Sequence, residues 1–292
     1  MEERHFYNCA TKGLEDDTLF GSTAAFIAGM NRVAICLLLT LESSPLIIMA
    51  FCLMDNHVHF ILYCTEETCK RFLSLYKRLT EIWLTNHPEQ GSPGKKWDIG
   101  HWLIKDRDNL IEKINYVHRN PTAAHMPFTP RGYRWSSGNL LFTDHAFTKS
   151  ICRKASDISR NEKRRMFESK VAVPDDWLVL PDGMIWPGCY VSYARVEKLF
   201  SSVFNYMYEL NKRCEEKVNK EMMTDFISLP DGEIRSKAIE LSQQLFSTEF
   251  LPGLSVDQRI LLAKELRKSM GASSKQIARI VRMNLTELRK LI

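Results

Sequence analysis

The stretch LIIMAFCLMDNHVHFIL, residues 46–62, constrains the fold of this chain more than any other part of its sequence. Residues 46–54 form a continuous apolar run of the kind found in buried β-strands, and a second apolar run follows Asp55-Asn56. Short polar side chains such as these two tolerate the positive φ angles of tight turns. The stretch therefore predicts two neighbouring strands joined by a hairpin.

Two histidines interrupt the second apolar run. Side chains alternate between the two faces of a strand, so His57 and His59 project from one side while Val58 and Phe60 project from the other. Imidazole is tolerated in a core only when its ring nitrogens find partners, and two rings that converge on one point need a shared explanation. Metal ligation is one candidate, although an isolated H-x-H pattern is more often structural.

The rest of residues 1–142 alternates between strand and helix patterns. The apolar spacing predicts further strands near 5–11 and 99–105, and helices near 23–39, 66–86 and 108–120. We therefore expect an α+β fold, in which a sheet of mainly antiparallel strands carries helices on one face. At 292 residues, 45% of them hydrophobic, the chain is long enough for a second domain.

The richest source of a third metal ligand is the stretch INYVHRNP, residues 114–121. On a helix Tyr116 and Asn120 are four residues apart and share a face, whereas His118 points elsewhere and is expected at the surface or behind the site. If the shared face packs over the histidine strand, Asn120 completes the metal site and Tyr116 lies beside it. Pro121 disfavours helical continuation, so we expect the helix to end there.

A divalent cation beside a tyrosine suits attack on a phosphodiester. The ion binds phosphate oxygens and polarises the phosphorus, and the tyrosine oxygen displaces a 3′-hydroxyl to leave a 5′-phosphotyrosine. Because this bond retains the energy of the phosphodiester, a 3′-hydroxyl can reverse the attack. Such chemistry cleaves and rejoins DNA without ATP.

Three blocks of sequence, MDNHVHFIL, YVHRNP and RGYRWSS (residues 131–137), together resemble the REP-associated tyrosine transposases. These belong to the single-tyrosine branch of the HUH endonucleases, and the resemblance covers about residues 1–142. It implies a ferredoxin-like antiparallel sheet, Mg²⁺ or Mn²⁺ as cofactor, and single-stranded or hairpin DNA from REP-like inverted repeats as substrate. By position it makes His57 and His59 metal ligands, Tyr116 the nucleophile and Asn120 the third ligand.

The chain continues for about 150 residues beyond this catalytic domain. Residues 143–191 are expected to form a basic linker or irregular segment, and residues 192–292 a helical extension. Its last part, residues 255–292, holds three sequences that resemble capping boxes, Ser255 with Gln258, Ser273 with Gln276, and Asn284 with Glu287. They predict three short helices, which together resemble a helix-turn-helix.

Basic residues concentrate in this extension. Residues 1–150 contain 16 Lys and Arg against 16 Asp and Glu, so the net charge of +5 resides in the second half of the chain. Residues 259–292 hold nine basic and two acidic side chains, which favours a polyanion partner over a merely solvated helix surface. The candidate DNA-binding residues are Lys275, Arg279, Arg282, Arg289 and Lys290.

The competing hypothesis is a non-catalytic DNA-binding regulator derived from such a transposase. We expect a cytoplasmic protein with no membrane association, because the eight cysteines form no CxxC pair and no apolar run approaches the roughly 20 residues of a membrane span. The expected oligomeric state is a monomer or a homodimer.

Overall fold

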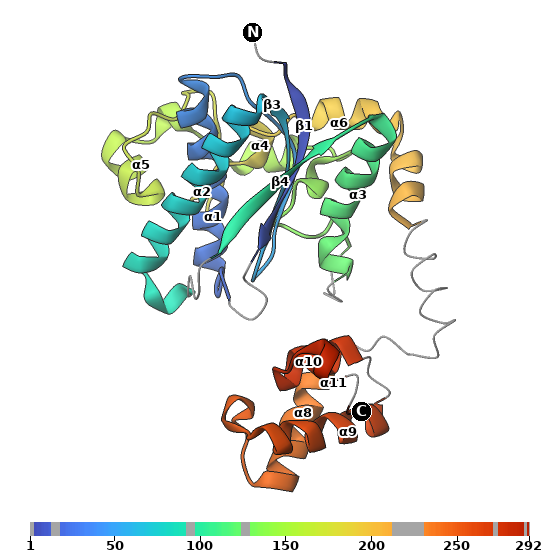
Figure 1. The fold of residues 1–292 in the computed structure, drawn as a ribbon. Helices are drawn as coiled ribbons and strands as arrows, with labels where there is room; N and C mark the ends of the chain where they lie inside the picture. The colour runs from blue at the N-terminus through green and yellow to red at the C-terminus, as the bar shows by residue number, and fades with distance from the viewer. Residues whose placement is uncertain are drawn as a thin grey trace. The chain divides into compact units, whose positions relative to one another are not determined.

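The computed structural model describes residues 3–12, 18–91, 97–123, 129–211, 231–270, 274–288 and 291. The chain divides into two compact units (Figure 1). The first comprises residues 1–122 and 128–207, and the second comprises residues 123–127 and 208–292.

A four-stranded antiparallel sheet forms the centre of the first unit, with the strand order β2-β3-β1-β4. Its elements follow one another as β1 (His5–Lys12), α1 (Thr23–Leu41), β2 (Ile47–Leu53), β3 (Val58–Cys64), α2 (Glu66–Asn86) and β4 (Asp98–Ile104). This βαββαβ succession with β1 and β3 in the middle is the ferredoxin-like topology. The α+β fold expected from the sequence is confirmed.

The hairpin between β2 and β3 is also confirmed. The Met54 N–H donates to the His57 carbonyl at 2.8 Å, which closes the turn. The Asp55 carbonyl accepts from the backbone N–H groups of Leu19 and Phe20, so the turn is held by the segment before α1. Thr11 in β1 fixes the start of β3, because its hydroxyl both donates to the Val58 carbonyl and accepts from the Val58 N–H.

Helices α1 and α2 cover one face of the sheet (Figure 1). There, Phe60 of β3 packs edge-on against Phe72 and Tyr76 of α2, with ring centroids 5.5 and 5.1 Å apart. By length and composition alone α1 is apolar enough to cross a membrane, with a mean hydropathy of 1.9, contrary to our expectation of no such segment. In this fold 67% of that apolar window is buried inside the protein.

Helix α3 (Arg107–Ala123) lies on the opposite face of the sheet (Figure 1). It continues through Pro121 and ends two residues later, so the expected end at the proline is wrong. A proline in the last turn removes one backbone hydrogen bond at a point where the helix is about to end, and this loss is tolerated.

Residues 143–191 do not separate the two units, as a linker would. Phe167, Val179, Ile185 and Trp186 are buried in the same core as the sheet. The Asn31 side chain of α1 clamps this segment, because its Nδ2 donates to the Gly183 carbonyl and its Oδ1 accepts from the Ile185 N–H. The segment contains only short elements, which are α4 (Ala146–Ile151), β5 (Arg153–Lys154), α5 (Arg160–Phe167) and β6 (Leu178–Val179), with α6 (Tyr193–Phe200) following.

Short 3₁₀ turns also occur, at η1 (Pro88–Gln90), η2 (Ser137–Leu140), η3 (Ala155–Asp157), η4 (Pro187–Cys189) and η5 (Leu251–Gly253).

The second unit is helical, as expected. It contains α8 (Asp231–Phe246), α9 (Val256–Met270), α10 (Ser274–Val281) and α11 (Leu285–Leu288). The capping box of α9 is complete, because the Ser255 N–H donates to Gln258 Oε1 and the Gln258 N–H donates to Ser255 Oγ. For α11 the Glu287 N–H donates to Asn284 Oδ1, while Ser273 of the third expected box lies outside the described residues.

Candidate active site

The two histidines of the HVH sequence project from the sheet face that is opposite α1 and α2. His57 directly precedes β3 and His59 pairs with Ala10 in it, and their ring centroids lie 5.0 Å apart at an interplanar angle of 86°. His59 is 6% exposed. Burial, with the nearby His57 ring as a smaller cause, lowers the pKa of His59 to about 3. Its imidazole is therefore neutral at physiological pH, which is the form that binds metals.

Asn120 presents its side-chain oxygen to the histidines. Its Nδ2 donates to the Tyr116 carbonyl at 3.0 Å, which turns Oδ1 toward His57 Nε2, also 3.0 Å away. On the other side of the ring, His57 Nδ1 lies 2.6 Å from Asn56 Oδ1. A neutral imidazole has a single N–H and can donate to only one of these two oxygens, so in the tautomer that donates to Asn56 the Nε2 lone pair faces the Asn120 oxygen.

In that tautomer His57 Nε2 and Asn120 Oδ1 are two acceptors 3.0 Å apart, a separation that suits a cation bound by both. Octahedral Mg²⁺ takes ligands at about 2.1 Å, which places neighbouring ligands about 3.0 Å apart. The buried His59 Nδ1 adds a nitrogen that has no hydrogen-bond partner among the described residues. No group of three or more His, Cys, Asp and Glu side chains that could hold a metal occurs in the described part of the chain. A metal here would therefore rely on two imidazoles and one amide, a set whose nitrogen ligands favour Mn²⁺ over Mg²⁺.

Tyr116 lies beside this group. Its ring centroid is 5.4 Å from that of His59, the two planes are nearly perpendicular at 88°, and the tyrosine is 50% exposed. Asn120, one helical turn further on, is 8% exposed. The structure therefore brings together all four residues that the sequence singled out, with the amide buried against the histidines and the phenol open to solvent.

A second polar cluster behind the site involves His118, which is fully buried. Its Nε2 lies 2.9 Å from Ser137 Oγ and its Nδ1 lies 3.0 Å from the hydroxyl of Tyr206. Ser137 Oγ in turn accepts from the Phe51 N–H of β2 at 2.9 Å. Burial lowers the pKa of His118 to about 3. These contacts could not be predicted from local sequence, because Ser137 and Tyr206 are 19 and 88 residues away from His118.

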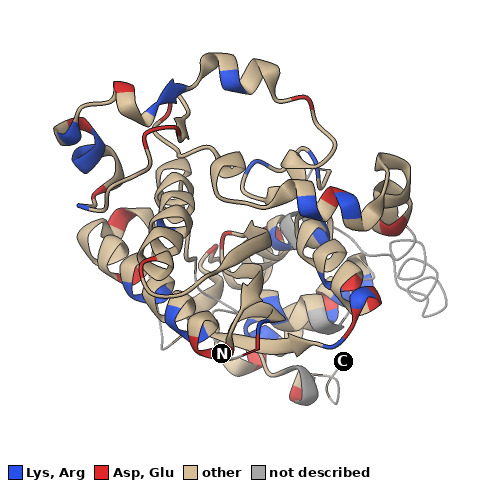
Figure 2. Cartoon of the chain, turned by 90° about the horizontal axis from the view of Figure 1, so that it is seen from above, with Lys and Arg blue, Asp and Glu red and all other residues tan. Residues whose placement is uncertain are grey.

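The candidate DNA-binding residues of the second unit are described only in part. Arg279 and Arg282 are exposed, whereas the side chains of Lys275, Arg289 and Lys290 lie outside the described part of the chain. Arg259 serves the fold instead, because its guanidinium donates to three carbonyls, those of Leu254, Arg282 and Pro252. Figure 2 shows basic and acidic residues interspersed along most of the chain.

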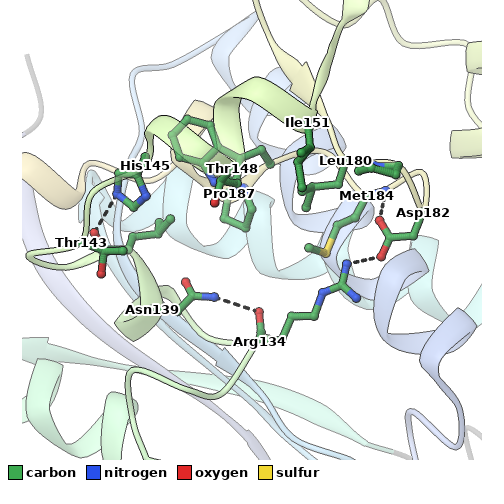
Figure 3. Close-up of a pocket in the computed structure, with 13 residues that line it drawn as sticks. Arg134, Asn139, Thr143, His145, Thr148, Ile151, Leu180, Asp182, Met184 and Pro187 are labelled. Carbon is green, nitrogen blue, oxygen red and sulfur yellow. Dashed lines mark hydrogen bonds and ion pairs between the residues drawn. The ribbon is translucent and has the colours of Figure 1, made fainter.

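The first unit also contains a cavity of about 500 Å³. The segments around residues 134–151 and 180–187 line it, and two of the lining residues, Arg134 and Asp182, pair with each other (Figure 3). None of the four candidate site residues contributes to its lining.

Comparison with known proteins adds one structural likeness. No protein-family model and no curated protein sequence matches the chain. A solved structure, that of a REP-associated tyrosine transposase bound to a REP hairpin, aligns with 46% of this chain and 75% of its own, at 13% sequence identity and a TM-score of 0.31.

Proposed function

We propose that this protein is a metal-dependent, single-tyrosine DNA transposase of the cytoplasm that cleaves and rejoins single-stranded or hairpin DNA through a 5′-phosphotyrosine. The observation that carries the proposal is the position of Tyr116, whose exposed phenol stands 5.4 Å from the ring of a buried, neutral histidine. The backbone carbonyl of the same tyrosine orients the amide of Asn120 toward His57.

His57, His59 and Asn120 would hold Mn²⁺ or Mg²⁺, which when bound supplies positive charge that offsets the developing charge on a phosphate. These residues need little rearrangement to do so. His59 is already neutral, and Asn120 is fixed by its bond to the Tyr116 carbonyl. Such a preorganised site avoids the cost of ordering its ligands when the substrate arrives.

Tyr116 supplies the nucleophile. Its phenolic oxygen forms a bond to phosphorus as the bond from phosphorus to the 3′-oxygen breaks, and the proton lost by the phenol is balanced by the one that the leaving 3′-oxygen gains. The protein then carries the 5′ end of the downstream strand. A 3′-hydroxyl that attacks this phosphotyrosine restores a phosphodiester and frees the tyrosine.

The test is covalent capture of DNA. Hairpin-bearing oligonucleotides from inverted repeats around the gene, labelled at the 3′ end, are incubated with the protein and Mn²⁺. Wild type should form a labelled adduct that survives denaturation, and Tyr116→Phe should form none while it still binds the oligonucleotide. Tyr208→Phe, which alters another exposed tyrosine, serves as the control and should behave as wild type.

The competing function predicts a different result. A regulator without catalytic activity binds the same DNA but yields no adduct with any metal. An adduct that persists in Tyr116→Phe would assign the nucleophile to another residue and overturn the proposal.

A further inference from the structure

The sheet face that carries the histidines extends beyond them toward the edge strand β4. Strand register places Ala10 of β1 between His59 of β3 and Gly100 of β4, so these three residues form one cross-strand row on that face. The next row on the same face contains Ile61, Asn8 and Trp102. Trp102 therefore shares a surface with the candidate active site.

Trp102 is 45% exposed, whereas the other five tryptophans are buried or half-buried. It lies two strands across and one two-residue step along from His59. At about 4.8 Å between strands and about 3.3 Å per residue, the two Cα positions are about 12 Å apart. Ala10 has only a methyl side chain and Gly100 has none, so no large side chain projects from the sheet face between the indole and the histidines.

The chemistry of this face suits a nucleic acid strand better than an apolar partner. Arg4 lies over the Tyr63 ring at 5.7 Å, and Tyr63 packs against Phe6 at 4.6 Å, all on the same face as Trp102. Exposed aromatic rings near cations are how single strands are bound, since each base offers a face for stacking and each phosphate offers a charge. Asn8 beside the indole and Arg4 further along make this face more polar than the contiguous apolar area of a protein interface.

We infer that Trp102 is a stacking platform for one base of the single-stranded DNA whose phosphate reaches Tyr116. This inference rests on the proposed function. It assigns a binding position to a base of the DNA that is several nucleotides away from the reacting phosphate. At about 3.4 Å per stacked nucleotide, the distance of about 12 Å between the Trp102 and His59 Cα positions corresponds to roughly three or four nucleotides, and to fewer if the strand is extended.

The experiment measures DNA binding in the absence of chemistry. Full-length protein carrying Tyr116→Phe is titrated in EDTA against a fluorescent single-stranded oligonucleotide and against its fully paired duplex. Adding Trp102→Ala should weaken single-strand binding by about 5- to 150-fold, the range for loss of one base–aromatic stack, and leave duplex binding unchanged. Trp102→Phe keeps an aromatic face and should retain most of the affinity.

Leu103→Ala is the matched control. Leu103 is the next residue of the same strand, is 52% exposed and points to the opposite face of the sheet, so its loss should not affect binding. In addition, 2-aminopurine placed at successive positions should be quenched at one position only, and Trp102→Ala should abolish that quenching. Thermal unfolding of each variant verifies that the fold is intact.

Unchanged single-strand affinity in Trp102→Ala would overturn the inference, as would equal losses in Leu103→Ala or on duplex DNA. The outcome is independent of the adduct assay. If no adduct forms but Trp102→Ala still weakens single-strand binding, the proposed chemistry is wrong and the DNA surface stands. If the adduct forms and Trp102→Ala has no effect, the chemistry stands and the platform is wrong.

Discussion

At the scale of the residue, orientation by the backbone decides what each polar side chain can do. Asn120 donates one amide hydrogen to the Tyr116 carbonyl, and that single bond directs its oxygen to His57. The spacing of Tyr116 and Asn120 was enough to predict that they share a helix face, because positions four apart on a helix are neighbours. It could not predict that the two residues would be linked to each other.

His118 and His59 make the stability of the first unit depend on pH. Both have a pKa lowered to about 3 by burial, against 6.5 for a histidine in an unfolded chain. The native state thus binds fewer protons than the unfolded state below pH 6.5. The contribution of these two histidines to the free energy of unfolding is fully present above that pH. It falls as the pH drops toward 3, by about 1.4 kcal/mol per pH unit for each histidine.

Urea unfolding in EDTA at pH 6.0, 5.25 and 4.5 measures this slope. His118→Gln should remove about half of it, because Gln is uncharged at every pH used. His145→Gln replaces a half-buried histidine whose Nε2 lies 3.0 Å from the Leu140 carbonyl, and it serves as the comparison for loss of an imidazole elsewhere in the unit. An unaltered slope in His118→Gln would show that this histidine takes up a proton as readily in the native state as in the unfolded chain, contrary to the lowered pKa.

At the scale of the element, helix α3 is held in place by contacts on the side of the helix away from the candidate site. Its own sequence favours a helix, but the contacts from His118 through Ser137 to Phe51 tie it to β2. Periodicity predicted most helices and strands to within a few residues, since each reflects local spacing of apolar side chains. The His118 contacts involve residues distant in sequence, which local spacing cannot reveal.

Helix α10 ends in a turn within residues 255–292, the segment whose sequence resembles a helix-turn-helix. Arg282 there has φ = 54°, a left-handed conformation that glycine adopts most easily. The Met283 N–H reaches back to the Ala278 carbonyl at 3.0 Å, which is the hydrogen bond of a Schellman cap. Arg282 therefore holds a backbone conformation that costs a non-glycine residue about 1 kcal/mol.

Arg282→Gly should raise the free energy of unfolding of the second unit by about 0.5–1 kcal/mol, because it relieves this strain. Arg282→Ala removes the same charge but keeps a Cβ atom, so it should give no gain. Differential scanning calorimetry of the full chain measures the transition of the second unit. Equal stabilisation by both variants would attribute the effect to charge repulsion among the nearby basic residues.

At the scale of the whole molecule, the residues that support the candidate site extend well beyond residues 1–142. Residues 1–142 were expected to form the catalytic domain. The composition of residues 143–170 indicated a solvated segment, because Ser, Arg and Lys are common there. Yet Phe167 of this stretch, and Ile185 and Trp186 after it, are buried in the same core as the sheet and α1. Burial of a few apolar residues in an irregular segment depends on distant partners and leaves no periodic signal.

The contact that decides where the first unit ends is made by Tyr206. It is fully buried, and its hydroxyl lies 3.0 Å from His118 Nδ1 on the helix that carries Tyr116. A chain truncated after residue 211 keeps this contact and the whole first unit, so it should fold and form the 3′-labelled adduct at a rate within a few-fold of wild type. A chain truncated after residue 142 loses Tyr206 together with the buried side chains of residues 143–200, and it should not fold.

Far-UV circular dichroism and cooperative unfolding in urea distinguish the two truncations, and the adduct assay reports whether the site is intact. Tyr206→Phe in the 211-residue chain removes the hydrogen bond to His118 but keeps the packing of the aromatic ring. It should fold, lose about 1–3 kcal/mol through the unpaired His118 nitrogen, and form less adduct. A 142-residue chain that folds and forms adduct as fast as wild type would show that the sheet and α3 alone hold Tyr116 against the histidines, and that the segment packed behind them is dispensable.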